Sequence, residues 1–136
     1  AGLQLRDACA EIMRAQGHPE PAGRAKLTCA YNLPARYVLH TVGPAVRGEL
    51  TQAHRDALAS CYRSCLDLAA KQDLTSIAFC CISTGEFHFP NQEAAEIAVR
   101  TVREFLEQQT TSVERVIFNV FKDLDAAIYR RLLGPD

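Results

Sequence analysis

A chain of 136 residues is long enough for one domain and leaves little room for two. Hydrophobic residues make up 48% of it, which allows a sizeable core and excludes disorder by composition. Its 15 basic and 16 acidic residues give a net charge of -1, which argues against non-specific binding of nucleic acid. That balance does not exclude a small anionic ligand held by backbone N–H groups.

The first third of the chain predicts one helix and two strands. Apolar residues at mixed three- and four-residue spacing over residues 3–15 predict an amphipathic helix. No capping residue precedes it, so we expect that the start of the domain is missing. Residues 24–30 predict a short strand, and residues 36–42 predict a second one that ends at the turn signal Gly43-Pro44.

A long helix is predicted to begin after Thr51, whose side chain suits an N-cap, and to end near residue 72. Its apolar positions fall on one stripe, which should face the core. These positions are Leu58, Cys61, Tyr62, Cys65, Leu66 and Ala69.

Segments 76–82 and 115–121 are continuous apolar runs, which are typical of central parallel strands covered on both faces. We therefore expect them to be adjacent in one sheet. The order of helices and strands predicts an α/β fold, a three-layer α/β/α sandwich in which residues 1–136 form a single, partial domain. Ligands of such folds bind beyond the carboxyl ends of the strands.

Two more helices complete the chain. Asn91 is expected to cap the first, whose core face would carry Ala94, Ala95, Ile97, Ala98, Val102, Phe105 and Leu106. The second should run from about Asp123 to Leu133 and stop at Gly134-Pro135. Its inward residues would be Leu124, Ile128, Leu132 and Leu133.

The cysteines are expected to be free thiols of a cytoplasmic protein, because no signal peptide or membrane-length apolar run is visible. Adjacent Cys80 and Cys81 would point to opposite faces of a strand and so could not easily pair. Cys61 and Cys65 share a helix face without a CxxC pattern, which favours core packing over metal binding. The full set is Cys9, Cys29, Cys61, Cys65, Cys80 and Cys81.

The loop from Ser83 to Pro90 is the most informative stretch of the sequence. It leaves a buried strand, and it offers the hydroxyls of Ser83 and Thr84 beside Gly85, which permits a positive φ. Successive N–H groups in such a turn form an anion-binding concavity, although a plain strand-to-helix turn explains the spacing as well. Phe87 and Phe89 should cover either a nucleotide or the domain's own core.

The Ser-Thr-Gly-x-Phe-x-Phe-Pro run from Ser83 to Pro90 resembles the diphosphate-binding loop of macrodomains. The segment 31–44, YNLPARYVLHTVGP, is similar to the macrodomain strand that reads LPxxYVIHTVGP. Residues 1–10 and 80–87 look most like the zinc-dependent microbial branch, whose members are protein ADP-ribosyl hydrolases. This resemblance covers essentially the whole chain, and it implies a macrodomain-like sandwich that lacks its N-terminal strands.

The resemblance also implies a ligand site. It assigns ADP-ribose contacts to Ser83, Thr84, Gly85, Glu86 and Phe87, with Phe121 stacking on adenine and Asn119 near the same strand end. Asn119 fits a hydrogen-bonded core amide equally well. The chain contains neither the Asn-Ala-Ala-Asn segment nor the Cys/His zinc loop of the family. Zinc ligands and catalytic residues are therefore expected upstream of residue 1, and this chain alone is expected to be inactive.

Three functions remain open on the sequence. The chain belongs to a zinc-dependent hydrolase of ADP-ribosylated protein, or it is a module that binds ADP-ribose without cleaving it. In a third reading, an open sheet edge is completed by self-association. For the hydrolase, the resemblance implies a sirtuin-type ADP-ribosyltransferase and a lipoyl-carrier protein as partners; nucleic acid and membrane are not expected partners.

Overall fold

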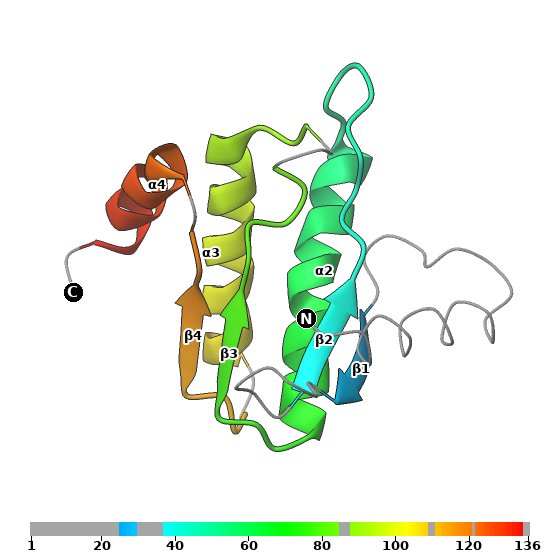
Figure 1. Cartoon of the computed structure of the whole chain (residues 1–136), viewed down its shortest axis with the longest axis vertical. Coiled ribbons are helices and arrows are strands. Elements are labelled where there is room, and N and C mark those ends of the chain that lie inside the picture. The colour runs from blue at the N-terminus through cyan, green and yellow to red at the C-terminus, as the bar shows by residue number, and fades with distance from the viewer. Residues whose placement is uncertain (1–24, 30–36, 85–87, 109–110, 121, 135–136) are drawn as a thin grey trace, which may run out of the picture.

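The structure, a computed structural model, describes residues 25–29, 37–84, 88–108, 111–120 and 122–134, and the helix predicted at residues 3–15 lies outside them. Its elements follow the predicted order of strands and helices (Figure 1). They are β1 (Ala25–Cys29), β2 (Tyr37–Thr41), α2 (Gln52–Lys71), β3 (Ser76–Phe79), α3 (Asn91–Gln108), β4 (Arg115–Phe118) and α4 (Asp123–Leu133).

The four described strands form two separate pairs. β1 is antiparallel to β2, with Leu27 opposite Leu39. β3 is parallel to β4, with Ala78 opposite Ile117, so the predicted adjacency of these two segments is confirmed. The arrows of β2, β3 and β4 run the same way in Figure 1. Helices packed on strands in this order are consistent with the predicted α/β sandwich.

Helix α2 begins as the sequence predicts. The Thr51 backbone N–H donates to His54 Nδ1 at 3.0 Å, and the His54 backbone N–H donates to Thr51 Oγ1 at 3.4 Å, which forms a reciprocal capping box. All six residues of the predicted apolar stripe are buried, with Leu58 and Leu66 fully inaccessible to solvent. Local capping and 3.6-residue periodicity therefore determine both the start and the buried face of this helix.

Parts of the predicted faces of α3 and α4 are wrong. Leu106, Leu124 and Leu133 are 38%, 58% and 45% exposed. Helix α4 packs on α3 through a narrow face that contains Asp125, Ile128 and Tyr129, and the side chains on its flanks stay in solvent. Its predicted end is confirmed, because Gly134 has a φ of 80° and its N–H donates to the carbonyl of Arg130.

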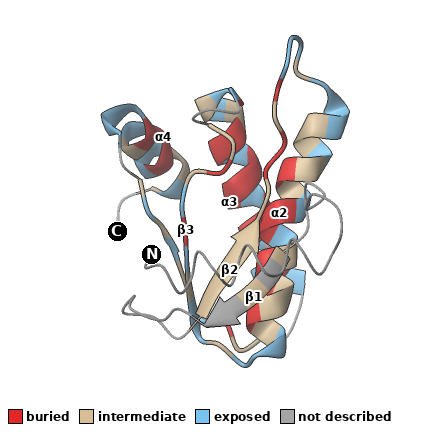
Figure 2. Ribbon diagram, turned by 45° about the vertical axis from the view of Figure 1, so that its right-hand side comes forward, coloured by how far each residue is buried: buried red, intermediate tan, exposed pale blue. Residues whose placement is uncertain are grey.

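Within the described part of the chain, helices cover one face of β3 and β4. Cover of their other face stays a prediction, because residues 1–24 lie outside the described ranges. Helices α2 and α3 lie behind the strands in Figure 1, and burial alternates along each strand (Figure 2). Phe79 is buried, whereas Ser76, Ala78 and Ile117 are exposed. The apolar composition reflects high β propensity, while the actual burial depends on which helices reach each face.

Four aromatic rings form a row beneath the sheet. Tyr62 of α2 lies with its ring centroid 4.8 Å from that of Phe79. Phe79 lies 6.3 Å from Phe118, and Phe118 lies 5.0 Å from Tyr129 of α4. Such tilted and offset pairs stabilise the fold beyond the area that they bury. The row links β3 and β4 to helices α2 and α4.

None of the described helices combines the length and the apolar character that a bilayer-spanning helix requires.

We predict that Leu66→Ala lowers the free energy of unfolding by about 2–5 kcal/mol, because Leu66 is fully buried and the substitution leaves a cavity. Leu124→Ala is the matched control, and its effect should stay within about 0.5 kcal/mol because Leu124 is 58% exposed. Urea unfolding followed by circular dichroism measures both. Equal losses for the two variants would contradict the burial assigned to α2 and α4.

Candidate functional site

Three loops lie at the same end of the strands, where β2, β3 and β4 terminate (Figure 1). Residues 42–46 follow β2, residues 80–84 follow β3, and residues 119–120 follow β4. In α/β folds, this carboxyl end of the sheet is where ligands bind. The site is therefore built from the segments that leave the sheet here.

Ser83 is the most unusual residue of these loops. Its φ is 67°, in the left-handed region that costs a residue with a side chain about 1–3 kcal/mol. Its Oγ is buried and has no hydrogen-bond partner. The backbone around it is ordered, because Phe89 N–H donates to the Ser83 carbonyl at 2.9 Å and Thr84 Oγ1 donates to the Cys81 carbonyl at 3.4 Å. A strained residue with an unpaired buried hydroxyl is typical of a binding site.

Gly43 allows the end of β2 to approach this turn. A Cβ atom on Gly43 would overlap Ser83 Oγ and would lie 2.6 Å from Ile82 Cγ2. On the helix side, Tyr62 forms a hydrogen bond with the backbone of Ile82. The Ser83 turn is therefore held between a side-chain-free segment of one strand and a hydroxyl of α2.

The aromatic residues of the loop fall into two groups. Phe89 is 1% exposed and packs in the core, so the core alternative is confirmed for this ring. Gly85, Glu86, Phe87 and Phe121 lie outside the described residues, and their contacts with a ligand stay predictions.

Asn119 lies where the sequence places it, at the carboxyl end of β4. Its backbone N–H donates to the Phe79 carbonyl at 2.7 Å and extends the pairing of the two strands. The residue is exposed, on the same face as Ile117, so the alternative of a buried core amide is wrong. The strand pairing therefore brings Asn119 to the end of the sheet from which the Ser83 loop departs.

A hydrogen bond between two helix starts was not predicted. Asn91, expected to cap α3, is instead its first residue, and its Nδ2 donates to Asp125 Oδ1 at 2.6 Å. Asp125 is only 5% exposed and lies in the first turn of α4, where a negative charge is favourable. Because α3 and α4 each follow a site loop, this contact fixes the two loops relative to each other. The sequence contained one hint of this contact, the acidic residue Asp125 in the first turn of α4. That hint did not identify Asn91 as the partner.

Burial keeps two of the four described thiols, those of Cys65 and Cys81, in the protonated form. Cys61, Cys65, Cys80 and Cys81 are not joined in disulfide bonds, as predicted. Burial raises the pKa of Cys81 to about 11, with the charge of Asp125 adding to the effect, and burial raises the pKa of Cys65 to about 12. Both are therefore protonated at neutral pH and are poor nucleophiles or metal ligands.

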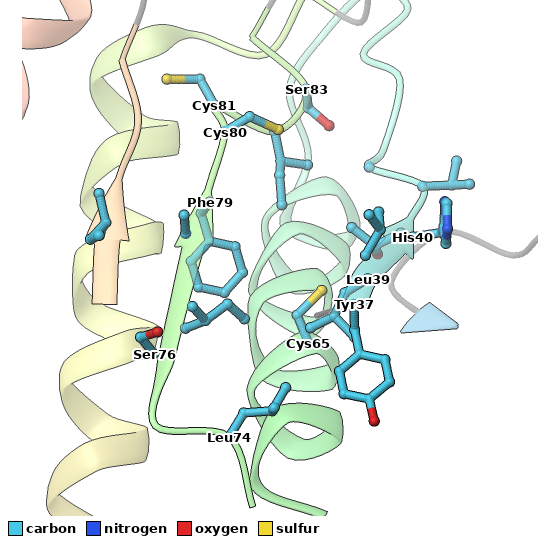
Figure 3. Close-up of a pocket in the computed structure, with 18 of the residues that line it drawn as sticks. Tyr37, Leu39, His40, Cys65, Leu74, Ser76, Phe79, Cys80, Cys81 and Ser83 are labelled. Carbon is cyan, nitrogen blue, oxygen red and sulfur yellow. The ribbon is translucent and has the colours of Figure 1, made fainter. Parts of the chain in front are cut away.

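The predicted orientations of the cysteines are confirmed for those that the structure describes. Cys80 and Cys81 project in opposite directions from the end of β3 (Figure 3). Cys61 is buried and its Sγ donates to the Val42 carbonyl at 3.3 Å, so core packing is confirmed for the α2 cysteines. Within the described ranges, no three His, Cys, Asp or Glu side chains are grouped so that they could hold a metal ion.

A cavity of about 940 Å³ lies between β2 and β3, with Ser83 at its rim (Figure 3). Its walls are the consecutive residues 37–43 and 74–83, with Cys65 and Ile117. Burial lowers the pKa of His40, the one titratable imidazole in these walls, so this ring is neutral at pH 7. The side chains that line the cavity therefore carry no charge, and the unpaired hydroxyl of Ser83 lies at its edge.

We predict that Ser83→Gly raises the free energy of unfolding by about 1 kcal/mol, because glycine adopts a positive φ without strain and the unpaired hydroxyl is removed. Ser64→Gly, in the middle of α2, should lower it by about 0.5 kcal/mol. Thermal and urea unfolding compare the two. Destabilisation by Ser83→Gly would show that this turn stores no strain.

The protein-family model described as Macro domain matches residues 1–98 of this chain. A Treponema medium protein named protein-ADP-ribose hydrolase is 55% identical over 134 residues, which are 98% of this chain and 51% of the relative. The chain therefore spans about half the length of the curated relatives it matches.

Solved structures give the same result. The Oceanobacillus iheyensis macrodomain with ADP is 36% identical, with a TM-score of 0.90, over 98% of this chain and 70% of that chain. The Trypanosoma brucei macrodomain in complex with ADP-ribose is 42% identical, with a TM-score of 0.75, over 84% of this chain and 47% of that chain.

Proposed function

Because this chain belongs to the Macro domain family, we propose that it forms the ADP-ribose-binding part of a protein-ADP-ribose hydrolase. One observation carries the proposal: Ser83 is held in a strained turn with a buried, unpaired hydroxyl at the carboxyl end of β3. The relatives support it, because the Treponema medium protein is named for this hydrolysis and the Trypanosoma brucei macrodomain holds ADP-ribose.

Binding would use neutral donors. The Ser83 hydroxyl would donate to an oxygen of the diphosphate, which removes the cost of leaving that group unpaired. Thr84 and the backbone N–H groups of the turn would complete an anion-binding concavity that needs no basic side chain. Gly43 would keep the floor of this turn free of a side chain. By the family resemblance, Gly85, Glu86, Phe87 and Phe121 would contact ADP-ribose, with Phe121 stacking on adenine, and Asn119 would lie near the same strand end.

The hydrolytic step is assigned to groups beyond the described residues. Zinc, which the resemblance implies, does not fit the described side chains, because they offer no group of three ligands and the Cys65 and Cys81 thiols stay protonated. The residues of this chain would bind and orient the diphosphate of an ADP-ribosylated protein.

A module that binds ADP-ribose without cleaving it is the second candidate. The protonated thiols and the uncharged cavity favour it for this chain alone, since both suit binding better than nucleophilic chemistry. A cytoplasmic location, and partnership with a sirtuin-type ADP-ribosyltransferase and a lipoyl-carrier protein, are proposed on the family resemblance only.

We predict that ADP-ribose titrated into the 136-residue chain binds, and that Ser83→Ala raises the dissociation constant about 10- to 100-fold. A hydrogen bond to a charged group contributes roughly 1.5–3 kcal/mol. Gly43→Ala should weaken binding as well, because its methyl group displaces the Ser83 turn. Ser60→Ala on the exposed surface of α2 is the control. Isothermal calorimetry measures all four, and equal affinities would remove Ser83 from the site.

A second prediction separates binding from catalysis. The 136-residue chain should bind no stoichiometric zinc and should release no ADP-ribose from a modified protein, whereas the full-length Treponema medium relative should release it. Metal analysis and a product assay on the two proteins side by side provide the measurement. Comparable turnover by the 136-residue chain would place the catalytic groups within these residues.

A further inference from the structure

We propose that Asn91 and Asp125 are positioning residues of the ADP-ribose site. Their hydrogen bond sets the separation between the Ser83 loop and the loop after β4, so that one ligand can contact both loops at once. This inference rests on the proposed function, in which the chain binds ADP-ribose. In it, neither side chain contacts the ligand, and both act through the helices that follow the two loops.

Asp125 carries a buried charge. It is 5% exposed, and among the residues whose side chains the structure describes no other charged group is buried. Burying a carboxylate is unfavourable unless the charge is stabilised. The Asn91 Nδ2, which donates to Asp125 Oδ1 at 2.6 Å, and the start of α4 provide that stabilisation. Because a hydrophobic residue would fill this space without the cost, the pair indicates a role in orientation rather than in stability.

The two residues lie where the two site loops end. The Ser83 loop closes at Phe89, which is buried, and Asn91 follows shortly after it as the first residue of α3. Asp125 lies in the first turn of α4, into which the loop after β4 leads. Helix α4 packs beside α3 (Figure 1). A contact between the first turns of these two helices therefore fixes where both loops end.

A second set of contacts holds the next turn of α4. Tyr129, which lies on the same face as Asp125, forms a hydrogen bond with Tyr62 of α2, and Tyr62 also bonds the backbone of Ile82. Burial raises the pKa of Cys81, and the charge of Asp125 adds to this effect, so the carboxylate lies close to the end of β3. Helix α4 is therefore held at two successive turns, by Tyr129 toward the sheet and by Asp125 toward α3.

The hydrogen bond adds direction to a contact that is otherwise apolar. Burial of Ile128 against the core is non-directional, and the flanking Leu124 is 58% exposed, so these side chains alone allow α4 to shift along α3. A ligand that spans two loops binds tightly only when the loops already stand at the required separation. Asn91 and Asp125 would supply that preorganisation.

The test compares two ligands on the 136-residue chain by isothermal calorimetry. ADP-ribose would contact both loops, whereas inorganic pyrophosphate would contact the Ser83 turn alone. Asn91→Ala should weaken ADP-ribose binding about tenfold, which corresponds to about 1.4 kcal/mol, and should change pyrophosphate binding by less than about twofold. General destabilisation would weaken both ligands alike, so the ratio of the two affinities isolates positioning.

An exchange of the two side chains is the matched rescue. Asn91→Asp alone brings two carboxylates together and should weaken ADP-ribose binding at least as much as Asn91→Ala does. Asn91→Asp combined with Asp125→Asn reverses donor and acceptor without changing the net charge, so it should restore ADP-ribose binding. Gln92→Ala, at an exposed position of the same helix turn, is the control that should leave both affinities unchanged.

Amide chemical shifts provide a readout that needs no ligand. In the ligand-free chain, Asn91→Ala should shift the amide resonances of Ser83 and Asn119, which lie in different loops and far from residue 91 along the chain or across the helix pair. The double exchange should return both resonances toward their positions in the parent. Gln92→Ala should leave them in place.

Equal weakening of the two ligands, unchanged ADP-ribose binding by Asn91→Ala, or no recovery in the double exchange would overturn the proposal. Failure of the parent chain to bind ADP-ribose would reject the proposed function instead. The chemical shifts then decide the positioning role: shifts at both Ser83 and Asn119 that the exchange reverses support it, and unchanged shifts reject it.

Discussion

The row of aromatic rings from Tyr62 through Phe79 and Phe118 to Tyr129 is the contact on which the rest of the structure depends. It joins α2 and β3 to β4 and α4, two pairs of elements that α3 separates along the chain. Because Tyr62 also forms a hydrogen bond with the backbone of Ile82, the row positions the turn that begins at Ser83. Burial raises the pKa of Tyr129 to about 12, so its hydroxyl stays neutral within this packing at any physiological pH.

A rigid support of this kind lets the site loop hold an unfavourable conformation. Ser83 keeps a positive φ and an unpaired buried hydroxyl because Gly43 lies against it, Tyr62 holds the preceding residue, and Phe89 anchors the far side of the loop in the core. Strain of this type persists only where the surroundings over-determine the backbone. The Asn91–Asp125 hydrogen bond extends the constraint to the loop after β4. Preorganised donors are what a site for a diphosphate requires.

The sheet itself is divided. One face of β3 and β4 packs on α2 and α3, and the other face carries exposed residues such as Ala78 and Ile117 (Figure 2). The division between the β1–β2 and β3–β4 pairs coincides with a cavity that is lined by residues of β2 and β3.

By itself, the sequence determined the local features. The α2 cap at Thr51 and its six-residue stripe, the end of α4 at Gly134, and the β3–β4 adjacency were predictable, because capping, periodicity and strand composition are properties of short segments. The resemblance pointed to Ser83 and Asn119, which follow β3 and β4 at the same end of the strands. Only the tertiary structure decided that Leu124 stays exposed, that Asn91 pairs with Asp125, and that Gly43 meets Ser83. These outcomes depend on which distant segments pack together, and no local pattern encodes that choice.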